Sequence, residues 1–338
     1  MLTIRSVDVE DDGDFDAFCR VFERAARADA PHMPVPADGE VRPFLRASPD
    51  STPVPLVAVL DGVTCGLALI HLHASTPDRA FANVVVAPEF RCRGVGHALT
   101  EAVVEKVVAS GRVLVDAEVA LPPGAGVDHP FCRFALAHGF RAGEVVVSRA
   151  LPLPVPDFDE LAREAAAHHA GYHIVTAVDD LPDHLMGGFV TLMNRIALEA
   201  PSGDLDVVDA GWDVESYRRR IALDVEGGRH RLLAVAVAPD GTVAAATAML
   251  ASSSDVFHQH GTIVVPEHRG RRLGVAVKVA NLRAAATAFP GRSSVVTSTA
   301  DTNAHMAAIN ERLGFAVVGA GVELQRQLQA TNCTPRAR

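Results

Sequence analysis

The sequence predicts an α/β (α+β) protein made of two similar halves, and three observations support this fold class. The segment Pro-Glu-Phe-Arg-Cys-Arg-Gly-Val-Gly at 88–96 recurs as Pro-Glu-His-Arg-Gly-Arg-Arg-Leu-Gly at 266–274, an offset of 178 residues. A β-branched apolar run precedes each copy, and apolar residues with helical spacing follow it. The tripeptides at 138–140 and 313–315 both end in Gly-Phe and repeat at a similar offset of 175 residues. Two landmarks with nearly equal offsets indicate an internal duplication.

The first half alternates between strand and helix patterns. Asp61-Gly62 lies between two apolar runs and predicts a β-hairpin, because this dipeptide suits a tight turn. Acidic residues at 11–14 open a helix, where negative charge interacts favourably with the helix dipole. The elements expected here are strands at 3–7, 55–60, 63–73, 81–86, 112–120 and 145–150, and helices at 11–22, 98–110 and 131–138.

A proline-punctuated segment at 151–156 and an alanine-rich helix at 157–170 separate the halves. After them the same order of elements begins again. The expected strands are 172–178, 231–238, 242–250, 256–265, 295–300 and 315–328, and the expected helices are 181–200, 214–224, a segment that begins near 276, and 303–312. We therefore predict an N-terminal domain at 1–152, a linker helix at 153–171 and a C-terminal domain at 172–330.

The composition is that of a soluble globular protein. Hydrophobic residues make up 49% of the chain, and no apolar run reaches the roughly 18 residues of a membrane helix. The net charge of −10 disfavours nucleic acid as a partner. The five cysteines are scattered without a Cys-x-x-Cys pair, which disfavours a zinc site or a disulfide framework. The only lysines, Lys106 and Lys278, indicate a coding preference for arginine. We expect a cytoplasmic protein with neither a membrane nor nucleic acid among its partners.

The repeated motif has the chemistry of a phosphate-binding loop. Free N–H groups at a helix start, with the positive end of the helix dipole behind them, attract an anion. Glycine allows the backbone to approach closely, and arginine adds charge-assisted contacts. Neither copy ends in the Gly-Lys-(Ser/Thr) of a nucleotide-binding P-loop, so we set that alternative aside.

The order of strand, Val-x-Pro-Glu-x-Arg-x-Arg-Gly-x-Gly loop and helix, followed by a later Leu-Gly-Phe, resembles the GNAT superfamily of N-acetyltransferases. The resemblance covers nearly all of the chain. The second half, with Met193-Asn194, 200–205 and Asp301-Thr302-Asn303, is most similar to tandem-domain members from actinobacteria. The resemblance implies two tandem folds, each a mixed, mostly antiparallel central sheet flanked by helices. It also implies that each sheet is splayed between its fourth and fifth strands, with acetyl-CoA in the gap.

The same resemblance implies cofactor-binding residues in both halves. Loop residues would bind the pyrophosphate, the ends of the preceding strands would meet the pantetheine with backbone groups, and Asn303 would contact the pantetheine arm or the thiol end. Two positions depart from the family pattern, because Arg272 stands where the first glycine belongs and Cys92 replaces a common glycine. The residues expected to bind acetyl-CoA are Val84, Val85, Val86, Arg91, Cys92, Arg93, Gly94, Val95, Gly96, Ile263, Val264, Val265, Arg269, Gly270, Arg271, Arg272, Leu273, Gly274 and Asn303.

Transfer of an acetyl group to an amine requires a group that removes a proton from the amine. His258 and His260 are two residues apart on a predicted strand and therefore share a face, and a neutral imidazole suits this task near pH 7. The alternative is a pair of surface or hydrogen-bonded histidines. A metal site is not supported, because the sequence places no third ligand beside them. His71 and His73 form a similar pair, expected on a hairpin face.

The family usually carries a tyrosine four residues before the final Leu-Gly-Phe glycine, as the acid for the departing thiolate. Asn310 occupies this place in the second half and Ala135 in the first, and neither can donate as a phenol does. A thiol has a pKa near 8.5, so the thiolate can leave without a dedicated acid. The catalytic residues predicted from the sequence are His258, His260 and Asn310.

The loop between the first two helices of the second half contains Asp204, Asp206 and Asp209. The resemblance places this loop over the acceptor site, where the carboxylates could hold a cationic amine. The other interpretation is a solvated acidic loop. We expect a small-molecule amine as the substrate, and a homodimer is compatible with the sequence.

The sequence therefore predicts an acetyl-CoA-dependent N-acetyltransferase that transfers the acetyl group directly to a primary amine in a ternary complex. We expect the second half to be catalytic, and the first half to bind the cofactor or to be structural. The alternative is a non-catalytic acyl-CoA-binding or regulatory module with degenerate active sites, which the missing tyrosines favour.

Overall fold

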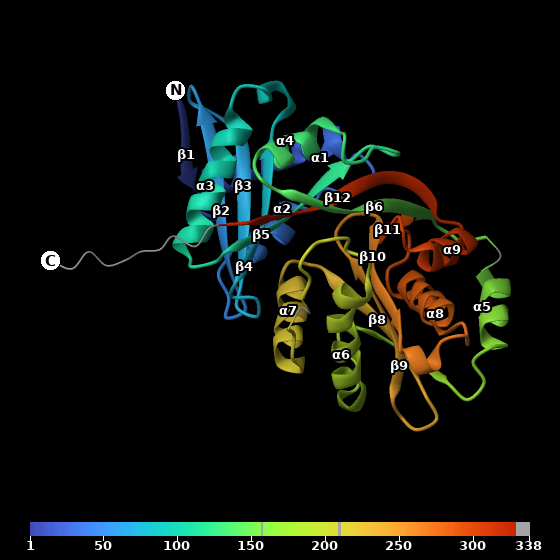
Figure 1. Cartoon of the computed structure of the whole chain (residues 1–338). Helices are drawn as coiled ribbons and strands as arrows, with labels where there is room; N and C mark the ends of the chain where they lie inside the picture. The colour runs from blue at the N-terminus through green and yellow to red at the C-terminus, as the bar shows by residue number, and fades with distance from the viewer. Residues whose placement is uncertain (157, 209–210, 329–338) are drawn as a thin grey trace.

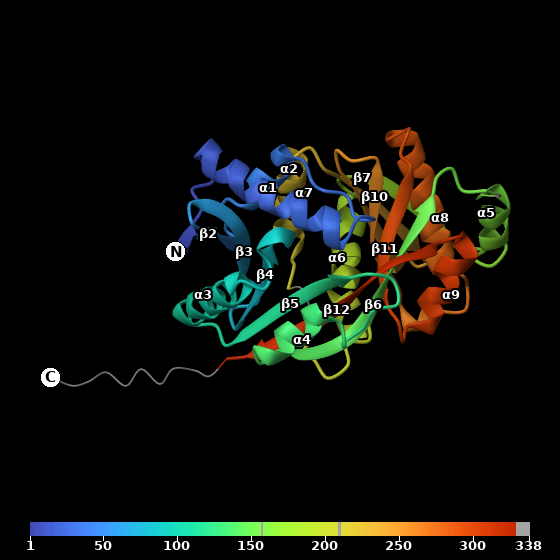
Figure 2. The ribbon, with the colours of Figure 1, turned by 90° about the horizontal axis from the view of Figure 1, so that it is seen from above.

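The computed structural model describes residues 1–156, 158–208 and 211–328 of the chain. Its described strands form one twelve-stranded sheet in the order β1-β2-β3-β4-β5-β12-β6-β11-β10-β9-β8-β7 (Figure 1). Helices cover both faces of this sheet. Figure 2 shows, for the first half, α1 and α3 on opposite sides of the strands between them.

The first half contains six strands and four α-helices among the described residues. Its elements are β1 (Leu2–Ser6), α1 (Asp12–Asp29), α2 (Asp38–Phe44), β2 (Ser51–Leu60), β3 (Val63–His73), β4 (Arg79–Val86), a 3₁₀ turn (Pro88–Phe90), α3 (Val95–Ala109), β5 (Leu114–Leu121), α4 (Pro130–Ala137) and β6 (Arg141–Pro152).

The second half repeats this order after the connecting helix α5 (Phe158–Ala166). Its elements are β7 (His173–Val178), α6 (Asp183–Glu199), α7 (Val214–Glu226), β8 (His230–Val237), β9 (Val243–Ala251), β10 (Val256–Val264), a 3₁₀ turn (Pro266–His268), α8 (Leu273–Ala288), β11 (Ser294–Ala300), α9 (Ala304–Leu313) and β12 (Ala316–Gln327).

The two halves exchange their last strands. Strand β12 pairs antiparallel with β5 of the first half over 320–327, and β6 pairs antiparallel with β11 of the second half over 146–152. Strands β6 and β12 also pair with each other, so they lie side by side at the centre of the sheet (Figure 1). Each half therefore inserts a strand into the sheet of the other, and neither 1–152 nor 172–330 contains a complete sheet. The division of the chain at these residues stays a prediction.

In both halves the fourth and fifth strands are splayed. Strands β4 and β5 are parallel partners only from Arg79 to Phe81, and β10 and β11 only from Val256 to His258. Beyond these pairs, the remaining residues of β4 and β10 are bonded only to β3 and β9. This confirms the sheet that the resemblance implied.

Two layers of core enclose the sheet in each half. In the first half, Phe15 and Phe18 of α1 pack on Val57 and Leu67, while α3 packs on alternate residues of the same strands. In the second half, α6 and α7 pack on Leu233 and neighbouring residues, and α8 and α9 pack on the opposite face. The loops that follow β4 and β10 are therefore attached to strands that are packed between helices.

The predicted hairpin is confirmed, and one helix was missed. Asp61 and Gly62 both have positive φ, at 51° and 83°, as a tight hairpin turn requires. Helix α2 was not predicted, because Gly39 and Pro43 lower the intrinsic helix propensity of this short segment. It is held by packing against α7 of the second half, a contact that the local sequence does not encode.

None of the helices in the described part of the chain combines the length and apolar character needed to span a bilayer. Within the same residues, no cluster of three or more histidine, cysteine, aspartate or glutamate side chains could hold a metal ion.

The strand exchange predicts that the chain unfolds as one cooperative unit. Segments 1–152 and 172–330, produced separately, should be largely unfolded or aggregated, because each lacks the partner strand beside its fifth strand. Produced together, they should elute as one complex. The measurements are circular dichroism and size-exclusion chromatography, with calorimetry of the intact chain as the control. Two separate thermal transitions in the intact chain, or two well-folded isolated halves, would contradict this expectation.

Candidate active site

The two repeated loops have the same backbone geometry. In the first loop the left-handed residues are Cys92, with φ 59°, and Gly94, with φ 79°. In the second they are Gly270, with φ 81°, and Arg272, with φ 54°. Each loop therefore has a glycine at one left-handed position and another residue at the other, which costs about 1–2 kcal/mol. Arg272 does not distort its loop, because it adopts the conformation of Gly94.

Both loops present unpaired backbone N–H groups. The first amides bonded within the helices are those of Ala98 and Ala276, which donate to the carbonyls of Gly94 and Arg272 at 3.1 Å and 3.0 Å. The N–H groups of 92–97 and 270–275 have no acceptor among the described residues. They stand at the starts of α3 and α8, where the helix dipole is positive. This arrangement suits an anion such as a pyrophosphate.

The first arginine of each motif holds the loop in place. Arg91 donates through Nε to the carbonyl of Val86 at 3.1 Å and pairs with Asp29, the last residue of α1, at 2.7 Å. Arg269 likewise donates through Nε to the carbonyl of Val264, the last residue of β10, at 3.2 Å. It also pairs with Glu199, the last residue of α6, at 2.8 Å. These guanidinium groups therefore join the loop to the helix and strand behind it.

The remaining arginines of the loops differ between the halves. Arg93 lies over the ring of Phe90, 5.5 Å from its centre, and makes no ion pair with a described residue. Arg272 pairs with Glu164 of the connecting helix α5, which also pairs with Arg312. The bonds from these two arginines lower the pKa of Glu164. In the second half, a carboxylate of the chain itself is therefore bound beside the candidate anion site.

The end of α4 narrows the space beside the first motif. A Cβ atom added to Gly96 would lie 3.3 Å from the ring of Phe134, and His97 contacts His138 across the same gap at 3.0 Å. At Gly274 the nearest atom to an added Cβ, on a valine of β10, would be 3.6 Å away. Ile309 of α9 lies 3.8 Å from the same added Cβ, so the second motif has slightly more room.

The predicted strand residues lie on the edges that face the two gaps. Residues 84–86 are bonded to β3 and not to β5, and 263–264 are bonded to β9 and not to β11. A bulge between Gln259 and Thr262 bends β10 just before this point. Val265 donates its N–H to the carbonyl of Ala244 at 2.9 Å. Asn303 is the N-cap of α9, and its side chain accepts from the amide of Met306 at 3.1 Å.

Asn310 lies in the interior, with both atoms of its amide bonded. Its Oδ1 accepts from Nζ of Lys278 at 2.8 Å, and its Nδ2 donates to Thr299 at 3.2 Å. Asn310 is fully buried and Lys278 is 2% exposed. These contacts connect α8, α9 and β11. Burial lowers the pKa of Lys278 to about 8. This buried group was not predicted from the sequence, because a lysine on an apolar helix face is otherwise expected to reach solvent.

His258 and His260 share one face of β10, as the spacing predicted. Desolvation, and then the charge of Arg229, lower the pKa of His258. His260 reaches solvent, yet the surrounding protein lowers its pKa to about 3, first through desolvation and then through Arg231. Both imidazoles are therefore neutral near pH 7. Because a base with a pKa far below the working pH is weak, His258 is the better proton acceptor of the two.

The loop with the predicted acceptor carboxylates is anchored to strands at the centre and in the first half. The backbone N–H of Asp206 donates to Gln325 at 3.0 Å, and its carbonyl accepts from Arg79 at 3.0 Å. Its carboxylate pairs with Arg141 at 3.3 Å, and Arg141 also donates to the carbonyl of Asp204 at 3.4 Å. Asp209 lies outside the described residues. A role of these carboxylates in binding an amine stays a prediction.

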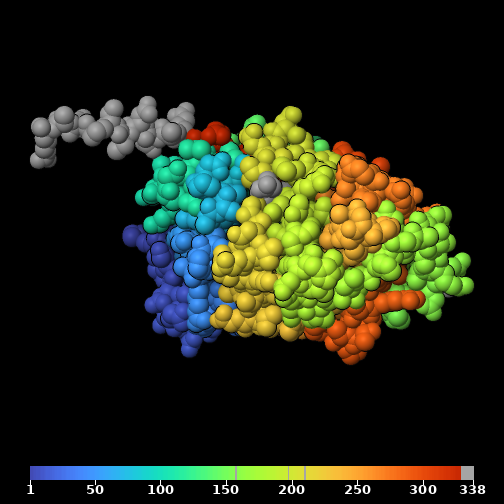
Figure 3. Space-filling model, turned by 90° about the horizontal axis from the view of Figure 1, so that it is seen from below, coloured from blue at the N-terminus to red at the C-terminus, as the bar shows by residue number. Residues whose placement is uncertain are grey.

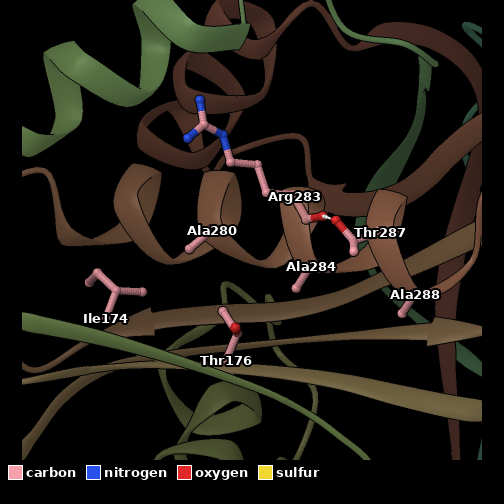
Figure 4. A pocket seen from close by; sticks show the side chains of 7 residues that line it. All are labelled: Ile174, Thr176, Ala280, Arg283, Ala284, Thr287 and Ala288. Atoms are coloured by element: carbon pink, nitrogen blue, oxygen red, sulfur yellow. Dashed lines mark hydrogen bonds between the residues drawn. The ribbon is translucent and has the colours of Figure 1, made fainter.

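A shallow hollow lies away from the loops, between β7 and α8 (Figure 4). It is lined by Ile174, Thr176, Ala280, Arg283, Ala284, Thr287 and Ala288. Arg283 points away from the hollow and pairs with Asp159 of α5. No histidine or carboxylate lines this hollow, so it lacks the groups needed for proton transfer.

Comparison with known proteins agrees with this geometry. The model of the acetyltransferase (GNAT) family matches residues 17–123. A solved tandem GNAT protein from the clavulanic acid biosynthesis pathway is 26% identical, with a TM-score of 0.78, over 97% of this chain and 98% of that one. None of the curated proteins compared with the sequence matches it.

Two more distant structures show the fold alone. A GCN5-related N-acetyltransferase from Sphaerobacter thermophilus is 15% identical, with a TM-score of 0.66, over 96% of this chain and 95% of that one. A glucosamine N-acetyltransferase region of a fungal multi-domain β-N-acetylglucosaminidase is also 15% identical, with a TM-score of 0.65, over 96% of this chain and 38% of that one. The two repeated loops and two splayed sheets are thus arranged as in the solved tandem GNAT protein, to which the chain is similar over nearly its whole length. Within the first half, residues 17–123 match the acetyltransferase (GNAT) family model.

The buried Lys278 predicts a specific pH dependence of stability. Its pKa is about 8 in the folded protein against 10.5 for an ordinary lysine. Between these values the unfolded chain binds a proton that the folded protein has lost, so folding becomes more favourable as the pH rises. At 1.36 kcal/mol per pKa unit, the unfolding free energy of the wild type relative to Lys278→Met should rise by about 3 kcal/mol from pH 8 to 10.5. Chemical denaturation at several pH values measures this difference, and a flat difference would show that the pKa is not lowered.

Proposed function

We propose that this protein is an N-acetyltransferase that moves the acetyl group of acetyl-CoA to a primary amine of a small molecule, by direct transfer in a ternary complex. The observation that carries the proposal is the second loop, with its unpaired N–H groups, at the open end of the splayed strands β10 and β11. His258 and His260 stand on the same strand, close to that opening.

The residues present suit acetyl-CoA. The N–H groups of 92–97 or 270–275 would hold the pyrophosphate, and the free edge of β4 or β10 would hold the amide-rich pantetheine arm. Arg93 and Arg271 have charge available for the phosphates, whereas Arg272 would first have to leave Glu164. When bound, acetyl-CoA would supply an acetyl group already activated as a thioester.

The side chains and backbone of the protein then have three tasks. The gap must hold the acceptor nitrogen close to the thioester, a free N–H on the edge of β10 must stabilise negative charge on the acetyl oxygen, and a base must take the proton of the amine. His258 is the candidate base on this strand, because its imidazole is neutral near pH 7 and it lies where the pairing of β10 with β11 ends. Asn310 contributes by fixing α9 against α8 and β11.

We assign catalysis to the second half. The Cβ position of Gly274 has slightly more room than that of Gly96, and the strand with His258 and His260 belongs to this half. The first half would then bind the cofactor without transfer or act as a structural partner. The alternative is a non-catalytic acyl-CoA-binding or regulatory module. One observation favours it, because both amide atoms of Asn310, at the place of the usual acid, are bonded inside the protein.

Release of CoA from acetyl-CoA, measured across a panel of amines, separates the two functions. For the enzyme we expect release with at least one amine, and His258→Asn should lower the rate by about 10²–10⁴-fold, as for loss of a general base. The affinity for acetyl-CoA should not change in this variant. The same substitution at the exposed His184 on α6 is the matched control. Tight acetyl-CoA binding without release for any amine would instead support the binding module.

Paired glycine substitutions identify the half that binds the cofactor. Gly274→Asp should place a carboxylate beside the second pyrophosphate site and weaken acetyl-CoA binding by at least tenfold, because two anions would then share the helix start. The fold should be retained, since an added Cβ at this position has 3.6 Å of space and an acidic residue is favourable near a helix N-terminus. Gly96→Asp is the corresponding variant of the first half, and circular dichroism must confirm its fold because the added Cβ lies 3.3 Å from the ring of Phe134. Isothermal titration calorimetry gives the number of sites, and loss in the Gly96 variant alone would assign the cofactor to the first half.

A further inference from the structure

Histidines from both halves face the same helix, α7. Figure 3 shows α7, in yellow, lying directly beside the first half, in blue. Arg219 of α7 pairs with Asp50 at 2.7 Å, and the carbonyl of Asp50 accepts from Ala74, which follows His73 in the chain. The end of β3, with the stacked imidazoles of His71 and His73, therefore lies next to α7.

Helix α7 also packs on β8 of the second half. Arg231 of β8, Leu250 of β9 and His258 lie in register across three neighbouring strands, so the first and the last project from the same face. Arg231 donates to Asp224 of α7 at 2.5 Å and to Tyr217 of α7 at 3.2 Å. Helix α7 therefore lies on the face of the sheet from which His258 projects.

Arg220 of α7 lies near histidines of both halves. Desolvation lowers the pKa of His71, His73 and His260, and the positive charge of Arg220 lowers it further. We call these three histidines, His258 and Arg220 the histidine–arginine cluster. The guanidinium of Arg220 also lies 4.6 Å from the ring centre of Phe44, which belongs to α2. Residues of both halves therefore fix its position.

Arg220 lacks a full counter-charge. Its nearest carboxylate is Asp224 at 3.9 Å, and both oxygens of Asp224 already accept from Arg229 and Arg231 at 2.5 Å. Arg220 makes no hydrogen bond with a described residue, and 32% of its side chain is exposed. Burial and the neighbouring arginines lower its pKa to about 10.

The charge around the cluster is therefore positive. Three guanidinium groups share the single buried carboxylate of Asp224. The other nearby acid is Glu40 of α2, which is 3% exposed and accepts from the backbone N–H of Ser253. Arg220, Arg229 and Arg231 against these two carboxylates leave one positive charge uncompensated, and Arg112 adds a positive charge beside His73, while the histidines are neutral. Because Arg220 and His260 both reach solvent, a small ligand can approach this charge.

We propose that the histidine–arginine cluster binds the carboxylate of the acceptor, so that the substrate class is a small molecule with both a primary amine and a carboxylate. The planar guanidinium of Arg220 can donate two parallel bonds to a carboxylate, and one negative charge neutralises the excess. The amine end would then lie toward β10 and His258. This proposal rests on the proposed function, because it assumes that the acceptor lies on the histidine face of β10.

The test compares amines that differ only in one carboxylate. Amino acids with one to four carbons between the amine and the carboxyl group are assayed beside their primary amides, for CoA release and for binding by calorimetry in the presence of CoA. We expect the acids to react or bind at least tenfold better than the amides. Arg220→Gln should remove this preference, Arg220→Lys should retain part of it, and acetyl-CoA affinity should be unchanged in both variants.

Arg219→Gln is the matched control, because Arg219 precedes Arg220 on α7 but is already paired with Asp50 and Glu215. This variant should keep the preference for the acids. Equal use of acids and amides, an undiminished preference in Arg220→Gln, or no binding of any acid would overturn the proposed carboxylate site. If CoA is released only with amines that carry no carboxylate, the carboxylate site is overturned but the acetyltransferase proposal stands. If no amine causes CoA release, while the acids bind better than their amides and Arg220→Gln removes this preference, the carboxylate site stands and the proposed acetyl transfer is rejected.

Discussion

The antiparallel pairing of β6 with β12 is the interaction on which the rest of the structure depends. Each of these strands comes from the end of one half and enters the sheet of the other. Twelve strands therefore form one sheet, and the two halves cannot change their relative position without breaking ladder hydrogen bonds. This constraint brings α2 against α7. Phe44 and Glu40 of α2 reach the charged groups around Arg220 and Ser253 because the halves are joined in this way.

The two repeated loops have the same backbone shape, but different side chains surround them. Both loops have two left-handed residues and a row of free N–H groups. In the first half, Phe134 lies against the motif and no group corresponds to Lys278, since Thr100 occupies that position. In the second half, Glu164 binds Arg272 and a buried lysine joins α8 to α9. A repeated fold can thus keep its backbone while its side chains take separate roles, because the backbone geometry depends on few positions.

Much of the fold was predictable, because its signals are local. The Asp61-Gly62 turn, the helical spacing after each motif and the alternation of the strands are properties of neighbouring residues. Helix α2 was not predictable in this way, since its packing on a distant helix outweighs the low propensity of Gly39 and Pro43. The loops and the histidine strand were likewise recognisable, because they lie within single segments. Arg220 was not singled out, since Phe44 lies far from it in the sequence and its neighbour Asp224 is already bonded to Arg229 and Arg231.

The sequence by itself determined the duplication, the phosphate-type loops, the helices and strands around them, and the shared face of His258 and His260. These features follow from the spacing of residues along one segment, which the backbone geometry converts directly into structure. Only the tertiary structure decided the exchange of strands, the internal bonding of Asn310 and Asp206, and the excess charge beside the histidines. Each of these features depends on contacts between segments that are distant in the sequence, and on the exclusion of water where those segments pack together. A short pattern of residues does not specify such contacts, so these features could not be predicted from the sequence.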